Sequence, residues 1–182
     1  MKQILSKSIV LIGLMGSGKS AVGKMLSKAI GVPFSDTDNI IEKEVGKKIH
    51  QIFEGSGERY FRQFEEKVVE RALERPAHII STGGGSILSQ KTRSLIKLKS
   101  CSIWVQCDVR IIENRIRNQE KRPLLKNKNI VDTLIEKNEE RITFYRQADI
   151  HITNEDPDLE RAVDAVIKKL MLNKVIKNND YK

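Results

Sequence analysis

A glycine-rich segment near the amino terminus carries the strongest chemical signal in the sequence. Residues 13–20 read GLMGSGKS, a full G-x-x-x-x-G-K-S pattern. Glycines at this spacing let backbone N–H groups curl around an anion, and the amino terminus of the following helix adds partial positive charge. The lysine and the serine after it suit the outer phosphates and Mg²⁺. The segment therefore predicts a nucleotide-phosphate loop (P-loop), with these contact residues: Gly13, Gly16, Ser17, Gly18, Lys19, Ser20 and Ala21.

Two carboxylates follow the second apolar run of the chain. Asp36 and Asp38 lie in the segment FSDTD, where a buried strand is expected to end. The carboxyl ends of parallel strands share one edge of a sheet, so this pair should lie near the P-loop. The pair could hold Mg²⁺ through water, accept a hydroxyl proton, or bind a substrate diol. One of the two also suits the amino-terminal cap of the next helix.

Three successive glycines end the next apolar run, in the segment STGGG. Gly83, Gly84 and Gly85 cost backbone entropy that an ordinary connection avoids. They indicate either a close approach of the backbone to a ligand or a turn with positive φ. A plain flexible turn is the alternative.

Three arginines stand out by position. Arg62 lies off the apolar stripe of its expected helix, Arg122 precedes a proline in a polar stretch, and Arg146 follows Tyr145 near a helix end. Arginine offers a bidentate fork for carboxylate or phosphate groups. Each arginine taken alone is equally compatible with a surface charge.

Apolar runs alternate with helical periodicity along the chain, which predicts a three-layer α/β sandwich around a five-stranded, mostly parallel sheet. The expected strands cover residues 8–12, 32–36, 78–82, 102–106 and 150–153. The expected helices cover residues 19–30, 38–45, 49–54, 61–72, 89–98, 130–145 and 156–170, with a further helix capped by Asp108 and with Asp156 as the cap of the last.

Length and composition are those of one soluble domain. We expect a single domain over residues 1–172, a lid at about 116–129, and a flexible polar tail at 173–182. Two cysteines and three histidines form no metal cluster or disulfide framework. No apolar run has the length of a membrane span, and the first apolar stretch lacks a cleavage site, so we expect a cytoplasmic protein without a membrane partner.

The net charge of +9 suits a phosphorylated ligand or a nucleic acid. Basic residues outnumber acidic ones between Arg110 and Lys128, with no aromatic residue among them. Stacking on aromatic side chains is typical of single-strand binders, so a nucleotide site is favoured and no nucleic-acid partner is expected.

These motifs, in this order, resemble those of the shikimate kinase family. The matching pieces are GLMGSGKS, FSDTD, FRQFEE, STGGG, RPLL and FYRQAD, over roughly residues 8–170. The resemblance implies a P-loop NTPase fold like that of nucleoside-monophosphate kinases. It also implies transfer of the γ-phosphoryl group of ATP to the 3-hydroxyl of shikimate, a step of aromatic amino-acid biosynthesis through chorismate, by a monomer.

On the acceptor side, the resemblance implies that helices at 37–64 bind the substrate. Asp38 would bind hydroxyls of shikimate and lie near the attacking one. Arg62 and Arg146 would clamp its carboxylate. The three glycines at 83–85 would add backbone contacts.

On the donor side, the resemblance implies that Asp36 holds Mg²⁺ through water beside Ser20. Lys19 and Arg122 would neutralise the charge of the transferring phosphate, and Arg122 would close with the lid. Arg115 would pack on the adenine.

The residues alone leave two other functions open, one enzymatic and one regulatory. A related small-molecule kinase acting on gluconate would also need arginines for an anionic substrate. A regulatory nucleotide-binding module that reads guanine would carry N-K-x-D, and residues 127–130 read NKNI, without the aspartate.

Overall fold

A parallel sheet organises the computed structural model of the chain, which describes residues 5–117, 130–156 and 158–176. The sheet order is β2-β3-β1-β4-β5, and every pairing is parallel, as the sequence predicts for most of it. The strands are β1 (Ser8–Ile12), β2 (Phe34–Asp36), β3 (Ile79–Ser81), β4 (Ser100–Gln106) and β5 (Ile150–Thr153). All five lie where the apolar runs predict them, although β4 begins two residues earlier than expected.

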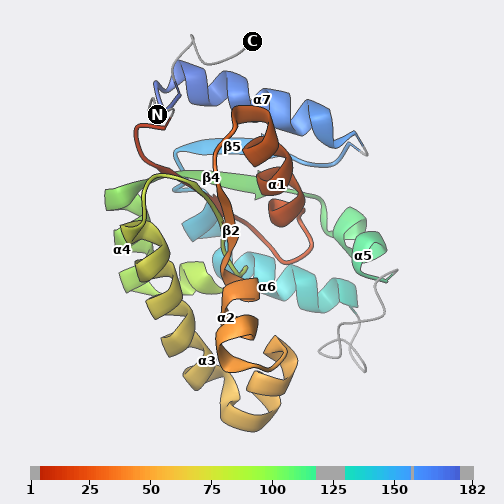
Figure 1. Cartoon of the computed structure of the whole chain (residues 1–182). Coiled ribbons are helices and arrows are strands. Elements are labelled where there is room, and N and C mark those ends of the chain that lie inside the picture. Colours follow the sequence, from red (N-terminus) through yellow and green to blue (C-terminus); the bar gives the residue numbers. More distant parts are fainter. Residues whose placement is uncertain (1–4, 118–129, 157, 177–182) are drawn as a thin grey trace.

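Helices cover both faces of the sheet and complete three layers (Figure 1). Side chains alternate along each strand, so Ile9 and Leu11 pack toward one face while Val10 and Ile12 pack toward the other. The first face is covered by α1 (Lys19–Ile30) and α7 (Leu159–Leu172). The second is covered by α3 (Ile49–Glu74), α4 (Gln90–Lys99) and α6 (Ile130–Tyr145).

A pair of helices extends beyond the carboxyl edge of the sheet (Figure 1). It consists of α2 (Thr37–Val45) and the first part of α3, which pack through buried residues such as Ile41 and Ile52. Gly57 interrupts α3 with a φ of 80° and a ψ of 164°. The two separate helices expected on either side of residue 57 are therefore confirmed, and the second begins earlier than its apolar stripe.

The connections of the sheet reverse direction between β1 and β3, where a ligand crevice is expected. These strands are neighbours, but the chain leaves β1 for α1 on one face and leaves β3 for α4 on the other, through a short 3₁₀ turn, η1 (Ser86–Leu88). Ligands of open α/β sheets bind where the direction of the connections reverses in this way. The P-loop and the three glycines at 83–85 stand on the two sides of this crevice.

The carboxyl-terminal part of the chain corrects two sequence predictions. The cap of α7 is Asp158 and not the predicted Asp156. The carboxylate of Asp158 accepts a hydrogen bond from the N–H of Glu160, while that of Asp156 accepts one from the N–H of Asp158 in the preceding turn. The predicted tail is too long: Ile176 is 3% exposed and pairs with Leu5 beside the first core face. Val175 and Ile176 hold the end of this polar segment against the core, because burial of their side chains outweighs the cost of ordering a few residues. Residues 177–182 lie outside the described part.

None of the helices in the described residues is long and apolar enough to cross a membrane.

Candidate active site

The P-loop connects β1 to α1 and is shaped by its glycines. Gly13, Gly16 and Gly18 have φ values of 144°, 78° and 94°, which other residues rarely adopt. The ammonium of Lys19 is buried and donates to the carbonyls of Gly13 and Leu14 at 2.9 Å each. The positive charge therefore lies inside the loop, beside the backbone that would surround a phosphate.

A hydroxyl and a carboxylate meet at the mouth of the loop. Ser20 Oγ donates to Asp36 Oδ2 at 2.5 Å and lies 3.2 Å from Ser81 Oγ. Asp36 Oδ1 also caps α2 by accepting the N–H groups of Asp38 and Asn39. One carboxylate oxygen of Asp36 thus caps α2, while the other accepts the hydrogen bond from Ser20.

The same pair fits a magnesium ion by the chemistry of its donors. Mg²⁺ prefers hard oxygen ligands and is commonly bound through one or two protein groups, substrate phosphates and several waters. Ser20 and Asp36 supply such oxygens side by side. Within residues 5–117, 130–156 and 158–176, no three His, Cys, Asp or Glu side chains form a metal cage.

The triple-glycine turn is crowded by charged side chains. A methyl group on Gly83 would lie 2.4 Å from Glu65 Oε1 and 2.8 Å from Asp38 Oδ1. A methyl group on Gly85 would lie 2.3 Å from Arg62 Nη2. These glycines have no positive φ, so the close approach of side chains, and not backbone shape, requires them here.

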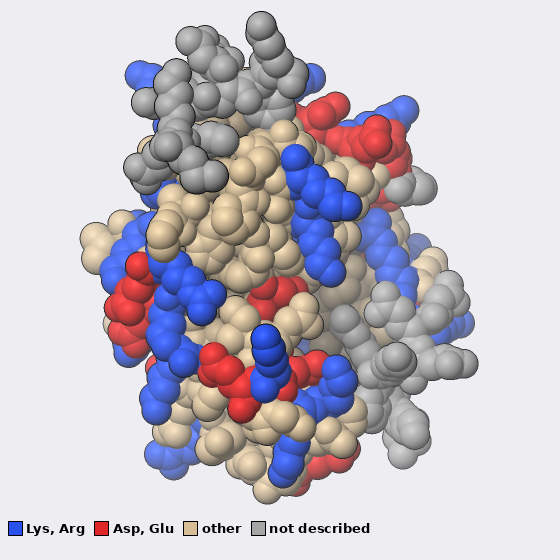
Figure 2. All heavy atoms as spheres, in the orientation of Figure 1, with Lys and Arg blue, Asp and Glu red and all other residues tan. Residues whose placement is uncertain are grey.

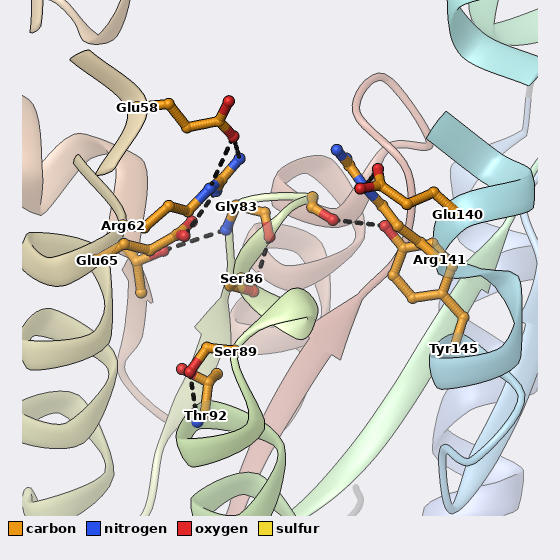
Figure 3. Close-up of polar contacts among 12 residues, drawn as sticks. Glu58, Arg62, Glu65, Gly83, Ser86, Ser89, Thr92, Glu140, Arg141 and Tyr145 are labelled. Atoms are coloured by element: carbon orange, nitrogen blue, oxygen red, sulfur yellow. Dashed lines mark hydrogen bonds and ion pairs between the residues drawn. The ribbon is translucent and has the colours of Figure 1, made fainter. Parts of the chain in front are cut away.

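Arg62 reaches the turn from α3 and is held there by two acids (Figure 3). Its guanidinium donates to Glu65 at 2.7 Å and to Glu58 at 3.0 Å, and it lies over the rings of Phe53 and Phe61. Burial alone would lower its pKa, but the two carboxylates outweigh burial and raise it. Arg62 is therefore a fixed cation at the site, as its place off the apolar stripe allowed.

Glu65 also lies at this turn, although it was not among the predicted residues of the site. It is 2% exposed, and within the described chain its Oε1 atom has no hydrogen-bond partner. Burial raises the pKa of its carboxyl group, while the ion pair with Arg62 opposes that rise. Its spacing of three residues from Arg62 was the available signal, since side chains three apart on a helix are neighbours.

The second arginine that the structure places at the turn is Arg141, and not the predicted Arg146. Arg146 follows the end of α6 and is exposed. Arg141 is 5% exposed, pairs with Glu140 at 3.2 Å, and stands opposite Arg62 across the triple-glycine turn (Figure 3). Residues four apart share a helix face, so Arg141 points where the buried Tyr145 points. Counting four residues back from Tyr145 along the same face of the helix identifies Arg141 from the sequence.

Tyr145 ties α6 to the turn. Its hydroxyl donates to the carbonyl of Gly84 at 2.6 Å. Burial raises its pKa to about 12, although the neighbouring Arg141 acts in the opposite direction. A methyl group on Gly84 would lie 3.0 Å from the backbone nitrogen of Met15, so the turn also presses against the P-loop.

The remaining predicted nucleotide contacts lie at the other end of the P-loop or outside the described residues. Arg115, on α5 (Val109–Arg117), donates to the sulfur of Cys107 at 3.3 Å and lies beside Gly18. Ala21 is exposed in the first turn of α1. Arg122 and most of the predicted lid, residues 118–129, fall outside the described part of the chain.

Known proteins with similar sequences decide the family. The family model described as shikimate kinase matches residues 15–171. The chain belongs to the shikimate kinase family. A shikimate kinase of Caulobacter vibrioides is 40% identical over 165 residues, which are 91% of this chain and 82% of that one. A shikimate kinase of Ruegeria pomeroyi is 38% identical over 171 residues, or 93% and 88%.

Solved structures of the family share the whole fold. A shikimate kinase from Acinetobacter baumannii in complex with shikimate aligns with a TM-score of 0.90 and 30% identity, over 95% of this chain and 97% of that one. The enzyme from Aquifex aeolicus aligns with a TM-score of 0.80 and 35% identity, over 92% and 98%. A gluconokinase from Sinorhizobium meliloti has a TM-score of 0.60 at 21% identity, over 93% and 96%, and thus shares the fold alone.

Membership of the shikimate kinase family confirms the resemblance predicted from the motifs. It makes the chain an ATP-dependent kinase and favours this function over that of a gluconate kinase or a regulatory module. Figure 2 shows both basic and acidic side chains on the face that it draws.

Proposed function

We propose that this chain transfers the γ-phosphoryl group of ATP to the 3-hydroxyl of shikimate. The observation that carries the proposal is the direct contact between the P-loop and a turn flanked by two arginines, Arg62 and Arg141. A phosphate-binding half and a carboxylate-binding half thus share one crevice. Membership of the shikimate kinase family supplies the identity of the acceptor.

The acceptor half is suited to a hydroxylated carboxylic acid. Arg62 and Arg141 would bind the carboxylate of shikimate from opposite sides, which replaces Arg146 of the sequence prediction by Arg141. Asp38, in the first turn of α2 and beside Gly83, would bind the hydroxyls. The turn at 83–85 would bring backbone groups to the ring because it carries no side chains.

The donor half is suited to a nucleoside triphosphate with Mg²⁺. The amides of the P-loop and the Lys19 ammonium would bind the phosphates, and Ser20 and Asp36 would hold the ion, Asp36 through water. When bound, Mg²⁺ neutralises charge on the β- and γ-phosphates. Arg115 would pack on the adenine, and Arg122 with the lid at 116–129 would close over the phosphates.

Catalysis would then rest on positioning and charge. Phosphoryl transfer requires an aligned nucleophile and a neutralised phosphate more than covalent participation of the enzyme. Asp38 would orient the attacking hydroxyl and receive its proton as the bond forms. Lys19 would stabilise the charge on the transferring group. We also propose that the monomer is the active form.

The decisive experiment is an assay of ADP release by the purified protein with ATP and Mg²⁺. We expect release that depends on shikimate, a phosphorus NMR signal from shikimate 3-phosphate, and no comparable release with gluconate. ATP should support the reaction better than GTP, because no guanine-reading motif is present. Release that does not depend on shikimate, or that gluconate supports equally, would overturn the proposal.

A further inference from the structure

One buried side chain, far from the P-loop in sequence, holds that loop by a backbone carbonyl. Asn154 directly follows β5 and is 3% exposed. Its Nδ2 atom donates to the carbonyl oxygen of Ser17 at 2.8 Å, across 137 residues of sequence. Its own N–H donates to the carbonyl of Gln106 at the end of β4, also at 2.8 Å. The sheet edge therefore fixes where the Asn154 amide stands.

Asn154 also lies close to Gly18, the next residue of the P-loop. A methyl group on Gly18 would lie 2.2 Å from Nδ2 of Asn154. Gly18 also has a φ of 94°. Both the backbone shape and the packed amide thus require glycine at position 18, and the amide of Asn154 leaves the Ser17–Gly18 peptide little room to rotate.

Holding the Ser17 carbonyl determines where the Gly18 N–H points. A trans peptide is planar, so its C=O and N–H groups point in opposite directions. No cis peptide occurs in the described chain. The N–H groups that precede a helix after a glycine-rich loop are those that bind phosphate. With its carbonyl held by Asn154, this peptide turns its N–H toward the phosphate side of the loop.

We infer that Asn154 is a positioning residue for the nucleotide phosphates, acting through the Ser17–Gly18 peptide. The inference rests on the proposed kinase function for the identity of the ligand. Asn154 does not itself touch the phosphates. Without its amide the Ser17 carbonyl would lose its partner, and rotation of the peptide would turn a carbonyl dipole toward the anion in place of an N–H.

The test compares ligands that contain phosphates with ligands that do not. We would measure binding of tripolyphosphate, ATP and adenosine to Asn154→Ala by calorimetry, together with the KM for shikimate. Loss of one hydrogen bond that orients a donor should weaken tripolyphosphate and ATP binding by about fivefold. Adenosine binding and the KM for shikimate should not change. Asn154→Asp keeps the shape but removes the donor, so it should weaken both phosphate ligands at least as much.

A matched control removes a chemically equivalent bond elsewhere. Asn173 Nδ2 donates to the carbonyl of Lys169 at 2.8 Å at the end of α7. Asn173→Ala should change thermal stability and leave tripolyphosphate binding as in the wild type.

Unchanged tripolyphosphate binding in a folded Asn154 variant would overturn the inference. So would an equal loss of adenosine and ATP binding, which would assign Asn154 to the nucleoside. If Asn154→Ala does not fold, the nearly isosteric Asn154→Asp decides the question by the same criteria. The proposed function fails if the wild type shows no shikimate-dependent ADP release. The inference about Asn154 fails on tripolyphosphate binding, which needs no shikimate, so the two failures are distinguishable.

Discussion

The two halves of the crevice both contain three glycines, and they use them for different physical reasons. In the P-loop, Gly13, Gly16 and Gly18 adopt positive φ values, so the backbone itself forms the phosphate cradle. In the turn at 83–85 the φ values are ordinary, and the missing side chains leave room for charged neighbours. In the proposed function the first half would bind with backbone amides, while the second makes space for side chains that come from elsewhere.

This difference explains why one half is local and the other is assembled. The P-loop is one continuous segment whose proposed binding groups are its own amides and Lys19. The acceptor half combines Asp38 from α2, Arg62 and Glu65 from α3, and Arg141 from α6 around the turn. Variants in each half should therefore separate the two substrates.

The largest separation is expected from Lys19→Ala. Removing a preorganised charge beside the transferring phosphate should lower kcat/KM for ATP by about 10³-fold. Shikimate binding measured without nucleotide should stay close to that of the wild type. Lys24→Ala, an exposed lysine on the same helix, is the matched control and should keep full activity. A parallel loss of shikimate binding in Lys19→Ala would show that the halves are not separable.

The next largest effect distinguishes Arg141 from Arg146. Arg141→Ala removes charged hydrogen bonds to the acceptor carboxylate and should raise the KM for shikimate by about 100-fold. Nucleotide binding should be retained. Arg146→Ala, at an exposed position, should change neither substrate's KM by more than about twofold. Steady-state kinetics with each substrate varied would measure both variants, and the opposite pattern would restore Arg146 to the site.

Adding a methyl group tests the spatial reason for the triple glycine. Gly83→Ala would force Glu65 and Asp38 apart and should raise the KM for shikimate by about tenfold, with a loss of stability of about 1–3 kcal/mol from overpacking. Gly55→Ala is the control, since nothing lies within 4 Å of its added methyl group. It should be neutral or slightly stabilising in thermal denaturation. Normal kinetics for Gly83→Ala would contradict the crowding.

The smallest effect is expected from Tyr145→Phe. The variant keeps the packing against Trp104 and removes the hydroxyl bond to Gly84, so unfolding should become easier by about 1 kcal/mol. The KM for shikimate should rise by about threefold, and the KM for ATP should stay constant, because the turn and not the P-loop is loosened. Calorimetric unfolding and kinetics would check this, and an effect on ATP alone would reverse the assignment of Tyr145.

Sequence reasoning succeeded where the controlling interactions are local. The strands and the P-loop follow from apolar runs and a continuous motif, and the cap formed by Asp36 follows from residues two and three positions away. It failed where a distant contact decides, as at Ile176, which folds back on Leu5. Arg146 was chosen because it follows Tyr145 in the motif, although helix rotation directs Arg141 to the site and leaves Arg146 in solvent.

The sequence by itself determined a phosphate-binding loop, a five-stranded α/β sheet and the family, because each rests on residue types at fixed short spacing. Only the tertiary structure decided which arginine faces Arg62, why residues 83–85 must be glycine, and that Asn154 holds the P-loop. The physical reason is the same in each case. These roles depend on side chains that approach from different elements, and the packing of helices on the sheet sets those distances.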